Sequence, residues 1–237
     1  MGSSWLLASI SAFASFEWLI DMVQFSDITG LLLVVIAISL LPFIAMVVTS
    51  YAKIVVVLGL LRNALGVQQV PPNMVLNGIA ILVSLYVMAP IGMQAAKALD
   101  EQQLASQSSQ AIIQALGSAR EPFRSFLEKH TPEREKRFFI RSASVIWPKE
   151  EASLLNERDL IVLAPAFALS ELTDAFKIGF LLYIVFIIVD LVIANVLLAL
   201  GLNQITPTNV AIPFKLLLFV AMDGWSTLIH GLVMTYK

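Results

Sequence analysis

Two acidic residues, Asp190 and Asp223, lie in or beside long apolar segments near the end of the chain. A carboxylate is costly in lipid, so such residues usually face a bundle interior, a wet cavity or a partner. Three interpretations fit: proteolytic aspartates that share a proton, a proton or ion relay, and a buried structural pair with a basic residue. The flanking sequences, IVDL and MDGW, do not resemble an intramembrane aspartyl protease motif. We therefore favour a structural pair with Lys215 as the basic partner, within or between subunits.

A second group of charges precedes the C-terminal apolar segments. Asp174 and Lys177 are three residues apart, so they can pair on one helical face. Glu171 has no such local partner. It belongs either to a solvated polar face or to a pair with Lys215 of a neighbouring copy, and both alternatives remain open at this stage.

Other side chains that could carry chemistry are scattered. His130 and His230 are isolated, whereas a metal site needs several convergent ligands. Ser39 and Ser84 lack the sequence context of a catalytic nucleophile. The sequence contains no glycine-rich phosphate loop and no cysteine. It therefore predicts no enzyme, no cofactor and no metal site.

Composition points to a membrane. The 237-residue chain is 58% hydrophobic and 14% charged, whereas soluble domains are about 25% charged. Its apolar residues form runs long enough to cross a bilayer. Ten of the 15 basic and ten of the 17 acidic residues lie between Lys97 and Asp159. The net charge of −2 gives no sign of nucleic-acid binding, and we expect a membrane protein with a charged middle part.

The apolar runs predict an all-α membrane protein with two helical hairpins. The first arm of the first hairpin carries Lys53, which we interpret as a topology anchor that reaches the interface. Its polar tip contains prolines that cannot donate a helix hydrogen bond, and comprises Arg62, Asn63, Gly66, Pro71 and Pro72. The predicted parts are an N-terminal amphipathic helix (1–29), the first hairpin (30–94), a soluble periplasmic helical module (95–160) and the second hairpin (161–237).

Within the module, Gln94–Leu116 is predicted to be an amphipathic helix that ends at Gly117-Ser118. Further helices are predicted to start at Glu121-Pro122 and at Thr131-Pro132, with Thr131 as a cap. Basic residues in short loops indicate the cytoplasmic side. Lys53, Arg62 and Lys215 lie near the two hairpin tips, which predicts both tips in the cytoplasm and the module with both termini on the far side.

Three blocks of the sequence resemble the FliP/SctR family of export-apparatus proteins in flagellar and virulence type III secretion systems. They are Leu40–Gly78, which includes LLRNALGVQQVPPN, then Pro165–Gly179 and Ile188–Trp225. The resemblance covers nearly everything from about residue 31 onward. The N-terminal region has no basic start or clean apolar core, so we expect no cleavable signal peptide like that of the flagellar branch. This difference favours the virulence branch.

The resemblance implies a helical cone in the bacterial inner membrane, raised toward the periplasm. It implies a pentamer of this subunit with the companion membrane proteins SctS and SctT, or FliQ and FliR, and unfolded substrates in transit. The charged residues would then pair between helices or between subunits; they are Glu171, Asp174, Lys177, Asp190, Lys215 and Asp223.

The resemblance also implies a pore gasket at Leu202, Asn203 and Gln204. Flagellar members carry a short methionine run at this place, and flexible thioethers can yield to a passing chain. Leucine keeps part of that property, whereas asparagine and glutamine would close the pore by hydrogen bonding or line it with water. The gasket role is therefore assigned by position and not by chemistry.

The predicted function is that of a core subunit of a type III secretion export gate. The alternative is a stand-alone ion or solute transporter, which predicts inverted repeats with broken helices around a midplane site. The two hairpins do not match each other in sequence. A structural nucleator, around which companions assemble, is compatible with the gate.

Overall fold

The computed structural model describes residues 35–36, 39, 45–67, 69–103 and 109–237, and these contain helices, turns and bends but no strand. The predicted all-α class is therefore confirmed for the described part of the chain. The chain divides into two compact units, residues 1–44 and 45–237. The predicted N-terminal helix over residues 1–29 lies outside the described residues.

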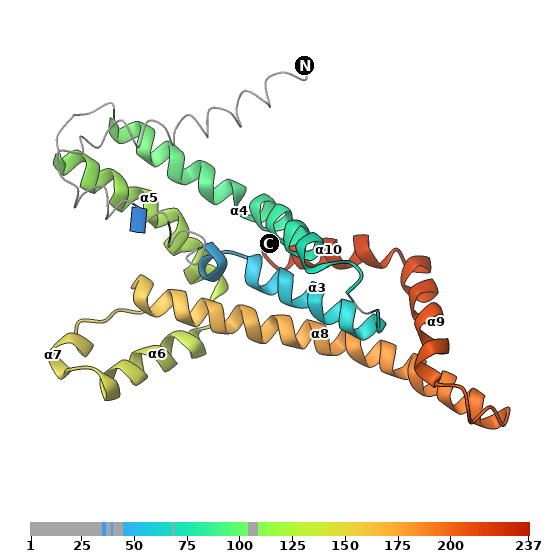
Figure 1. Ribbon diagram of the computed structural model, residues 1–237. Coiled ribbons are helices and arrows are strands. Elements are labelled where there is room, and N and C mark those ends of the chain that lie inside the picture. Colours follow the sequence, from blue (N-terminus) through green and yellow to red (C-terminus); the bar gives the residue numbers. More distant parts are fainter. Residues whose placement is uncertain (1–34, 37–38, 40–44, 68, 104–108) are drawn as a thin grey trace, which may run out of the picture. The chain divides into compact units, whose positions relative to one another are not determined.

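The second unit contains eight described helices, labelled as in Figure 1. They are α3 (Tyr51–Leu65), α4 (Asn73–Gln103), α5 (Ser109–His130), α6 (Glu133–Ile146), α7 (Lys149–Ala152), α8 (Leu160–Ala199), α9 (Pro207–Ala221) and α10 (Gly224–Met234). Two of the described helices are long and apolar enough to cross a membrane, over Asn73–Ala98 and Leu160–Ala199. The bent pair of α9 and α10 makes a third span if it is counted as one.

Helix α8 is the longest element, with 40 residues, or about 60 Å at the helical rise per residue. It contacts α3, α5, α6 and α9. The helix ends in a Schellman motif at Gly201, whose φ is +71°. The Leu202 N–H donates to the Leu197 carbonyl at 2.9 Å, and the Gly201 N–H to the Leu198 carbonyl at 3.0 Å. This turn starts the tip of the second hairpin.

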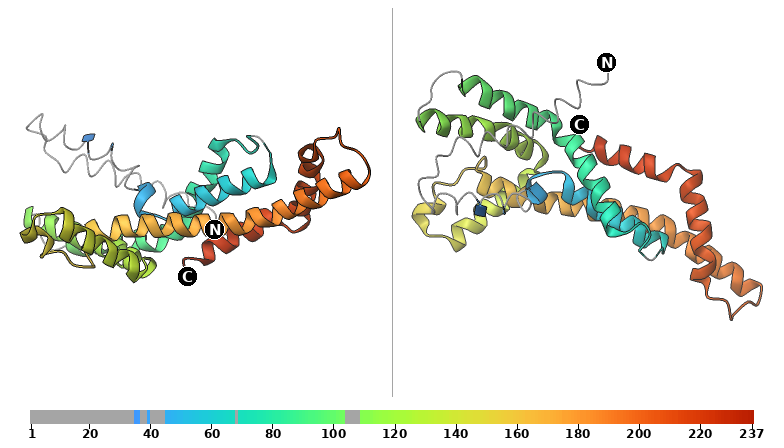
Figure 2. Two further views of the ribbon diagram at one scale, coloured as in Figure 1. Left: turned by 90° about the horizontal axis from the view of Figure 1, so that it is seen from below. Right: turned by 45° about the horizontal axis from the view of Figure 1, so that its top comes forward.

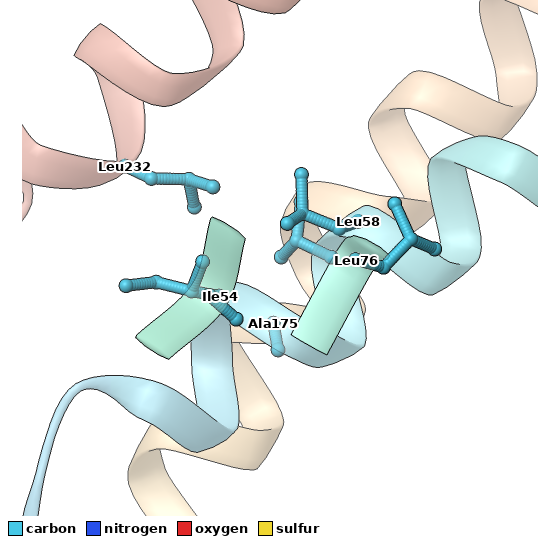
Figure 3. Packing of buried hydrophobic residues seen from close by; sticks show 7 residues of the cluster. Ile54, Leu58, Leu76, Ala175 and Leu232 are labelled. Carbon is cyan, nitrogen blue, oxygen red and sulfur yellow. The ribbon is translucent and has the colours of Figure 1, made fainter. Parts of the chain in front are cut away.

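Helix α3 lies in the core and contacts both α4 and α8. One cluster of buried residues joins α3, α4, α8 and α10 (Figure 3). Its members are Ile54, Val57, Leu58, Leu76, Ala80, Ala175 and Leu232. Because α3 packs against neighbours on several sides, an apolar sequence without a polar face is what its position requires.

Two helix boundaries in the middle of the chain differ from those predicted. Helix α4 continues to Gln103, and α5 runs from Ser109 through Gly117 and Pro122 without a break. The predicted stop at Gly117-Ser118 and the predicted start at Glu121-Pro122 are therefore wrong. A glycine in a helix interior costs only about 1 kcal/mol. Proline adds a second cost, because it has no backbone N–H to donate to the helix. The packing of α5 against α4 and α8 offsets both costs.

The second hairpin returns through a bent arm, with 62° between α9 and α10 (Figure 2). Asp223 lies at the bend with a left-handed φ of +49°. The next residue is glycine, and a Cβ atom there would lie 2.2 Å from Cε2 of Phe219. The ring of Phe219 meets Trp225 edge to face, with 5.3 Å between centroids. Backbone conformation and aromatic packing together set the bend.

Candidate functional site

The side chain of Lys53 points into the core and binds Glu171. Its Nζ lies 2.8 Å from Oε1 of Glu171, and the two side chains are 5% and 3% exposed. The predicted interfacial position of Lys53 is therefore wrong, and so is the solvated alternative for Glu171. Lys53 comes from α3 of the first hairpin and Glu171 from α8 of the second, so this ion pair joins the two hairpins.

Tyr236, close to the C-terminus, completes this cluster. Its hydroxyl donates a hydrogen bond to Oε2 of Glu171. Its ring lies beneath Nζ of Lys53, 4.3 Å from the ring centroid, which is a favourable cation–π distance. Both carboxylate oxygens of Glu171 thus have a donor, which a buried charge requires. The C-terminal end of the chain is fixed against α3 and α8.

Several aromatic side chains pack against Tyr236 where it faces α5. Phe126 stacks on Tyr236 at 6.1 Å and contacts Phe167 of α8 at 5.6 Å, both between ring centroids. The His130 ring lies 4.8 Å from Phe126 and 5.5 Å from Tyr236. Burial lowers the pKa of His130 below its usual 6.5, and the positive charges of Lys129 and Lys53 lower it further. The neutral imidazole is therefore favoured here.

A second buried lysine, Lys215 of α9, holds the other end of the hairpins together. Its Nζ lies 2.6 Å from Oδ2 of Asp190 and 3.1 Å from the carbonyl oxygen of Ala64. The Lys215 side chain is 5% exposed and that of Asp190 is 40% exposed. Ala64 is in the last turn of α3, where helix carbonyls lack an intrahelical donor and a cation is favoured. One ammonium group therefore connects α3, α8 and α9.

Asp223, the other predicted partner of Lys215, occupies a different position. It is exposed and lies at the N-terminus of α10. No described residue forms an ion pair with it, whereas Lys215 pairs with Asp190. Its backbone carbonyl accepts a hydrogen bond from the Thr227 N–H at 3.0 Å. The role of Asp223 within this chain is therefore to shape the bend and not to pair with Lys215.

Arg62 organises the tip of the first hairpin. Its Nη1 donates to the carbonyl oxygen of Pro71 at 3.2 Å and to Oδ1 of Asn73 at 2.6 Å. Gly66 ends α3 with a φ of +75°, and a Cβ atom there would lie 3.2 Å from Cγ1 of Ile212 in α9. The tip of the first hairpin therefore packs against the returning arm of the second. Among the other predicted tip residues, Asn63 and Pro72 are exposed and Pro71 is partly buried.

Small residues allow the helices to approach closely. A Cβ atom on Gly179 of α8 would lie only 2.2 Å from Cδ1 of Leu60 in α3. Ser50 Oγ and Ser84 Oγ are 3.0 Å apart, and Ser84 Oγ is 3.3 Å from Oγ1 of Thr49. This hydroxyl group joins the arms of the first hairpin where the helix is interrupted at residues 49–50. Such contacts between small and polar residues are typical of helices packed in membranes.

The remaining predicted site residues lie on the outside. Asp174 and Lys177 form an exposed ion pair at 2.9 Å on α8. Leu202, Asn203 and Gln204 are exposed in the loop between α8 and α9. The structure therefore brings together Lys215 and Asp190, and Lys177 and Asp174, but leaves the loop residues free on the surface of this chain.

Sequence reasoning missed Lys53, Tyr236, His130 and Ser50 as members of buried clusters. Lys53 lies four residues before Val57 and therefore shares a helical face with it. Val57 is fully buried. The surrounding segment is apolar on all sides, so the sequence does not indicate which face is inside.

Comparisons with known proteins agree on one family. The sequence model of the FliP family matches residues 33–232. The chain is 65% identical to the hypersensitivity response secretion protein HrcR of Ralstonia nicotianae, over 89% of this chain and 98% of that protein. It is 46% identical to the Yop proteins translocation protein R of Yersinia pestis, over 91% of this chain and 99% of that protein. It is 68% identical to "pathogenicity-related ORF2" of Xanthomonas campestris pv. glycines, over 90% of this chain and 100% of that protein.

Proposed function

Because the chain belongs to the FliP family, we propose that it is a core subunit of a type III secretion export gate. In this proposal several copies assemble around a pore through which unfolded protein substrates leave the cytoplasm. The names of its relatives, a hypersensitivity response secretion protein and a Yop translocation protein, support the virulence branch of the family.

One observation supports an assembly over a solitary membrane anchor: the apolar helices bury a few charged side chains between them and leave most of their own apolar surface uncovered. In the most apolar 18-residue stretch of each of these two helices, only a small share is buried within the chain: 22% in α4 and 11% in α8. Lys53, Glu171 and Lys215 are buried instead. Long uncovered apolar helices require either lipid or other subunits against them, and the exposed pair Asp174–Lys177 on α8 favours protein or water at that level.

The proposed assembly is a pentamer of this subunit with the companion proteins SctS and SctT. It lies in the bacterial inner membrane and projects toward the periplasm. The residues that follow α4 and precede α8 would form the periplasmic part, and the hairpin tips would face the cytoplasm. In this arrangement the subunit performs no chemistry of its own, and other components of the machine supply the energy.

The loop between α8 and α9 is the proposed gate element. Leu202, Asn203 and Gln204 lie at the end of a hairpin whose two arms are held by the Asp190–Lys215 pair. A ring of five such loops would place one apolar and two amide side chains from each subunit at a common constriction. Amides that hydrogen-bond to each other across the ring would limit leakage and still separate when a polypeptide enters.

A stand-alone ion or solute transporter is the second candidate. The 62° break between α9 and α10 favours it, because transporters build their sites from discontinuous helices. The two functions differ in their need for partners: a transporter would move solute when reconstituted alone, whereas a gate subunit would act only in the assembled complex.

The mass of the detergent-solubilised complex, with and without its companions, tests the assembly. A single mass of a multi-copy complex is expected, and a particle that stays solitary beside its companions would refute the proposal.

The pore is tested by replacing Asn203 and Gln204 with glycine. Small-solute leakage is expected to rise, whereas the control Gln69→Gly at the other hairpin tip, where φ is +60°, should not leak. Unchanged assembly, secretion and leakage would show that the constriction is misplaced.

A further inference from the structure

One side of α6 carries arginine and large apolar side chains into the solvent. Arg134, Phe138, Arg141 and Val145 follow each other at spacings of four, three and four residues, which places them on one helical face. Arg137 lies beside them, and all five residues are exposed. The fractional exposure is 54% for Phe138 and 84% for Val145. We refer to these five residues as the α6 face.

The opposite side of α6 is buried, which fixes the orientation of the helix. Lys136 and Ala143 are 4% and 6% exposed, and α6 contacts α8. Acidic residues of this helix are already engaged: Glu133 pairs with Lys136 at 2.7 Å, and Glu135 with Arg134 at 2.7 Å. Among the described residues, neither Arg137 nor Arg141 takes part in an ion pair. Arg137 and Arg141 therefore give the α6 face positive charge that no ion pair neutralises, beside its apolar side chains.

A merely solvated helix face would be rich in lysine and glutamate and would not expose both a phenylalanine and a valine. Arginine and aromatic residues are the types enriched where proteins bind each other, and lysine and glutamate are depleted there. Guanidinium groups form paired hydrogen bonds with carboxylates. The composition of the α6 face thus fits a partner that presents carboxylates around a small apolar patch.

An anionic lipid surface has a similar charge but does not reach this helix under the proposed function. The long apolar run of α8 begins at Ile178, and α5, which leads into α6, packs on α8 at Phe167. Eleven helical residues separate these positions, or about 16 Å. The headgroup layer on one side of a bilayer is only about 5 to 8 Å thick. Figure 1 shows α6 beside the beginning of α8.

We propose that the α6 face is a docking surface for an acidic face of a different protein in the aqueous space beside the membrane. The inference rests on the proposed function for the position of the bilayer. The arginines form charge-assisted hydrogen bonds with carboxylates of the partner, while Phe138 and Val145 lose their contact with water. Such an interface depends on the sign of the charge and weakens with salt.

Photo-crosslinking in cells that contain the complete secretion machine tests this proposal. A benzophenone amino acid replaces Val145, and in a control chain it replaces Leu154, which is 83% exposed but lies outside α6. The expected result is one adduct at Val145, formed with an acidic segment of another protein, and no such adduct at Leu154. Replacing Arg134, Arg137 and Arg141 together by glutamate should lower the adduct at least about tenfold, because like charges then meet. Replacement by lysine should preserve most of it.

The mass of the complex is measured for every variant, which separates this proposal from the proposed function. An adduct with lipid, an adduct with another copy of this chain, no adduct, or an adduct that is insensitive to charge reversal would overturn the docking surface, even if the complex assembles and secretes. If the triple glutamate variant lowers the amount of complex, the single substitution Arg141→Gln is scored per assembled complex. A smaller adduct then supports the proposal, and an unchanged adduct overturns it.

Discussion

Lys53 in α3 and Glu171 in α8 form a buried ion pair with 2.8 Å between Nζ and Oε1. The pair joins the first hairpin to the second, and the hydroxyl of Tyr236 fixes the C-terminal end at the same point. Removing two charges from water carries a large desolvation cost, so such a pair contributes little net stability. We expect it instead to favour one relative placement of the two hairpins, since each charge needs its partner.

Replacing Lys53 with methionine should therefore destabilise the protein strongly. Glu171 would remain buried with only Tyr236 as a donor, and breaking a buried pair from one side costs about 3–5 kcal/mol. The double variant Lys53→Met, Glu171→Leu should recover more than half of this loss, because no buried charge is left. Unfolding in detergent, followed by helical circular dichroism against denaturant concentration, provides both free energies.

The exposed pair Asp174–Lys177 serves as the matched control. Lys177→Met also removes a cation from an ion pair, one of 2.9 Å with Asp174 in α8, the helix that carries Glu171. Exposed pairs contribute only about 0–1 kcal/mol. Equal losses for Lys53→Met and Lys177→Met would contradict the buried position of Lys53.

The Asp190–Lys215 pair should respond asymmetrically to substitution. In Asp190→Asn the nearly buried ammonium of Lys215 keeps only the Ala64 carbonyl and an amide oxygen, at a cost approaching about 3 kcal/mol. In Lys215→Met the Asp190 side chain, which is 40% exposed, can be hydrated at Oδ2, while its Oδ1 is already buried without a hydrogen-bond partner among the described residues; about 1–2 kcal/mol is expected. The order of the two unfolding midpoints checks this prediction, and a larger loss for Lys215→Met would contradict it.

Much of the fold could be predicted because membrane helices show in the sequence as long apolar runs. The all-α class was confirmed, and the resemblance to the FliP family was confirmed by the match over residues 33–232. The division into four parts, the pentamer and the pore gasket remain predictions. Helix ends in the middle of the chain were wrong where Gly117 was treated as a stop and Pro122 as a start, since both lie within α5.

Buried polar residues were harder to predict for a different reason. Lys53 and Glu171 are 118 positions apart in sequence, and only the packing of α3 on α8 brings them together. The predicted cap at Thr131 was also wrong: its hydroxyl donates to the Leu127 carbonyl at 2.6 Å, and α6 has no side-chain cap bond. A helix-end hydroxyl can satisfy the preceding helix as readily as the following one, and local sequence does not distinguish the two.

Gly179→Ala should separate α3 from α8. The added methyl group would lie 2.2 Å from Cδ1 of Leu60, and overpacking of this kind costs about 1–3 kcal/mol. Shortening the neighbour in the double variant Gly179→Ala, Leu60→Val should restore part of the loss. The measurement is again the free energy of unfolding in detergent.

Gly59→Ala is the control for this substitution. Gly59 lies in α3 next to Leu60, but no atom lies within 4 Å of a Cβ atom built there. Alanine at this position should be neutral or stabilise by up to about 1 kcal/mol through helix propensity. A loss at Gly59 similar to that at Gly179 would mean that helix contact is not the cause.

His130 should make stability depend on pH. Its pKa is lowered from 6.5 by burial, by Lys129 and by Lys53, so the unfolded chain binds a proton more readily than the folded chain. The stabilisation is therefore present above about pH 6.5 and is lost as the pH falls through the lower pKa of the folded state. The unfolding free energy of the parent, measured between about pH 7.5 and about pH 5, should fall more steeply than that of His130→Gln. Lys129→Met removes one cause of the lowered pKa and should give an intermediate slope, whereas equal slopes in all three proteins would show that His130 is not held in its neutral form by this cluster.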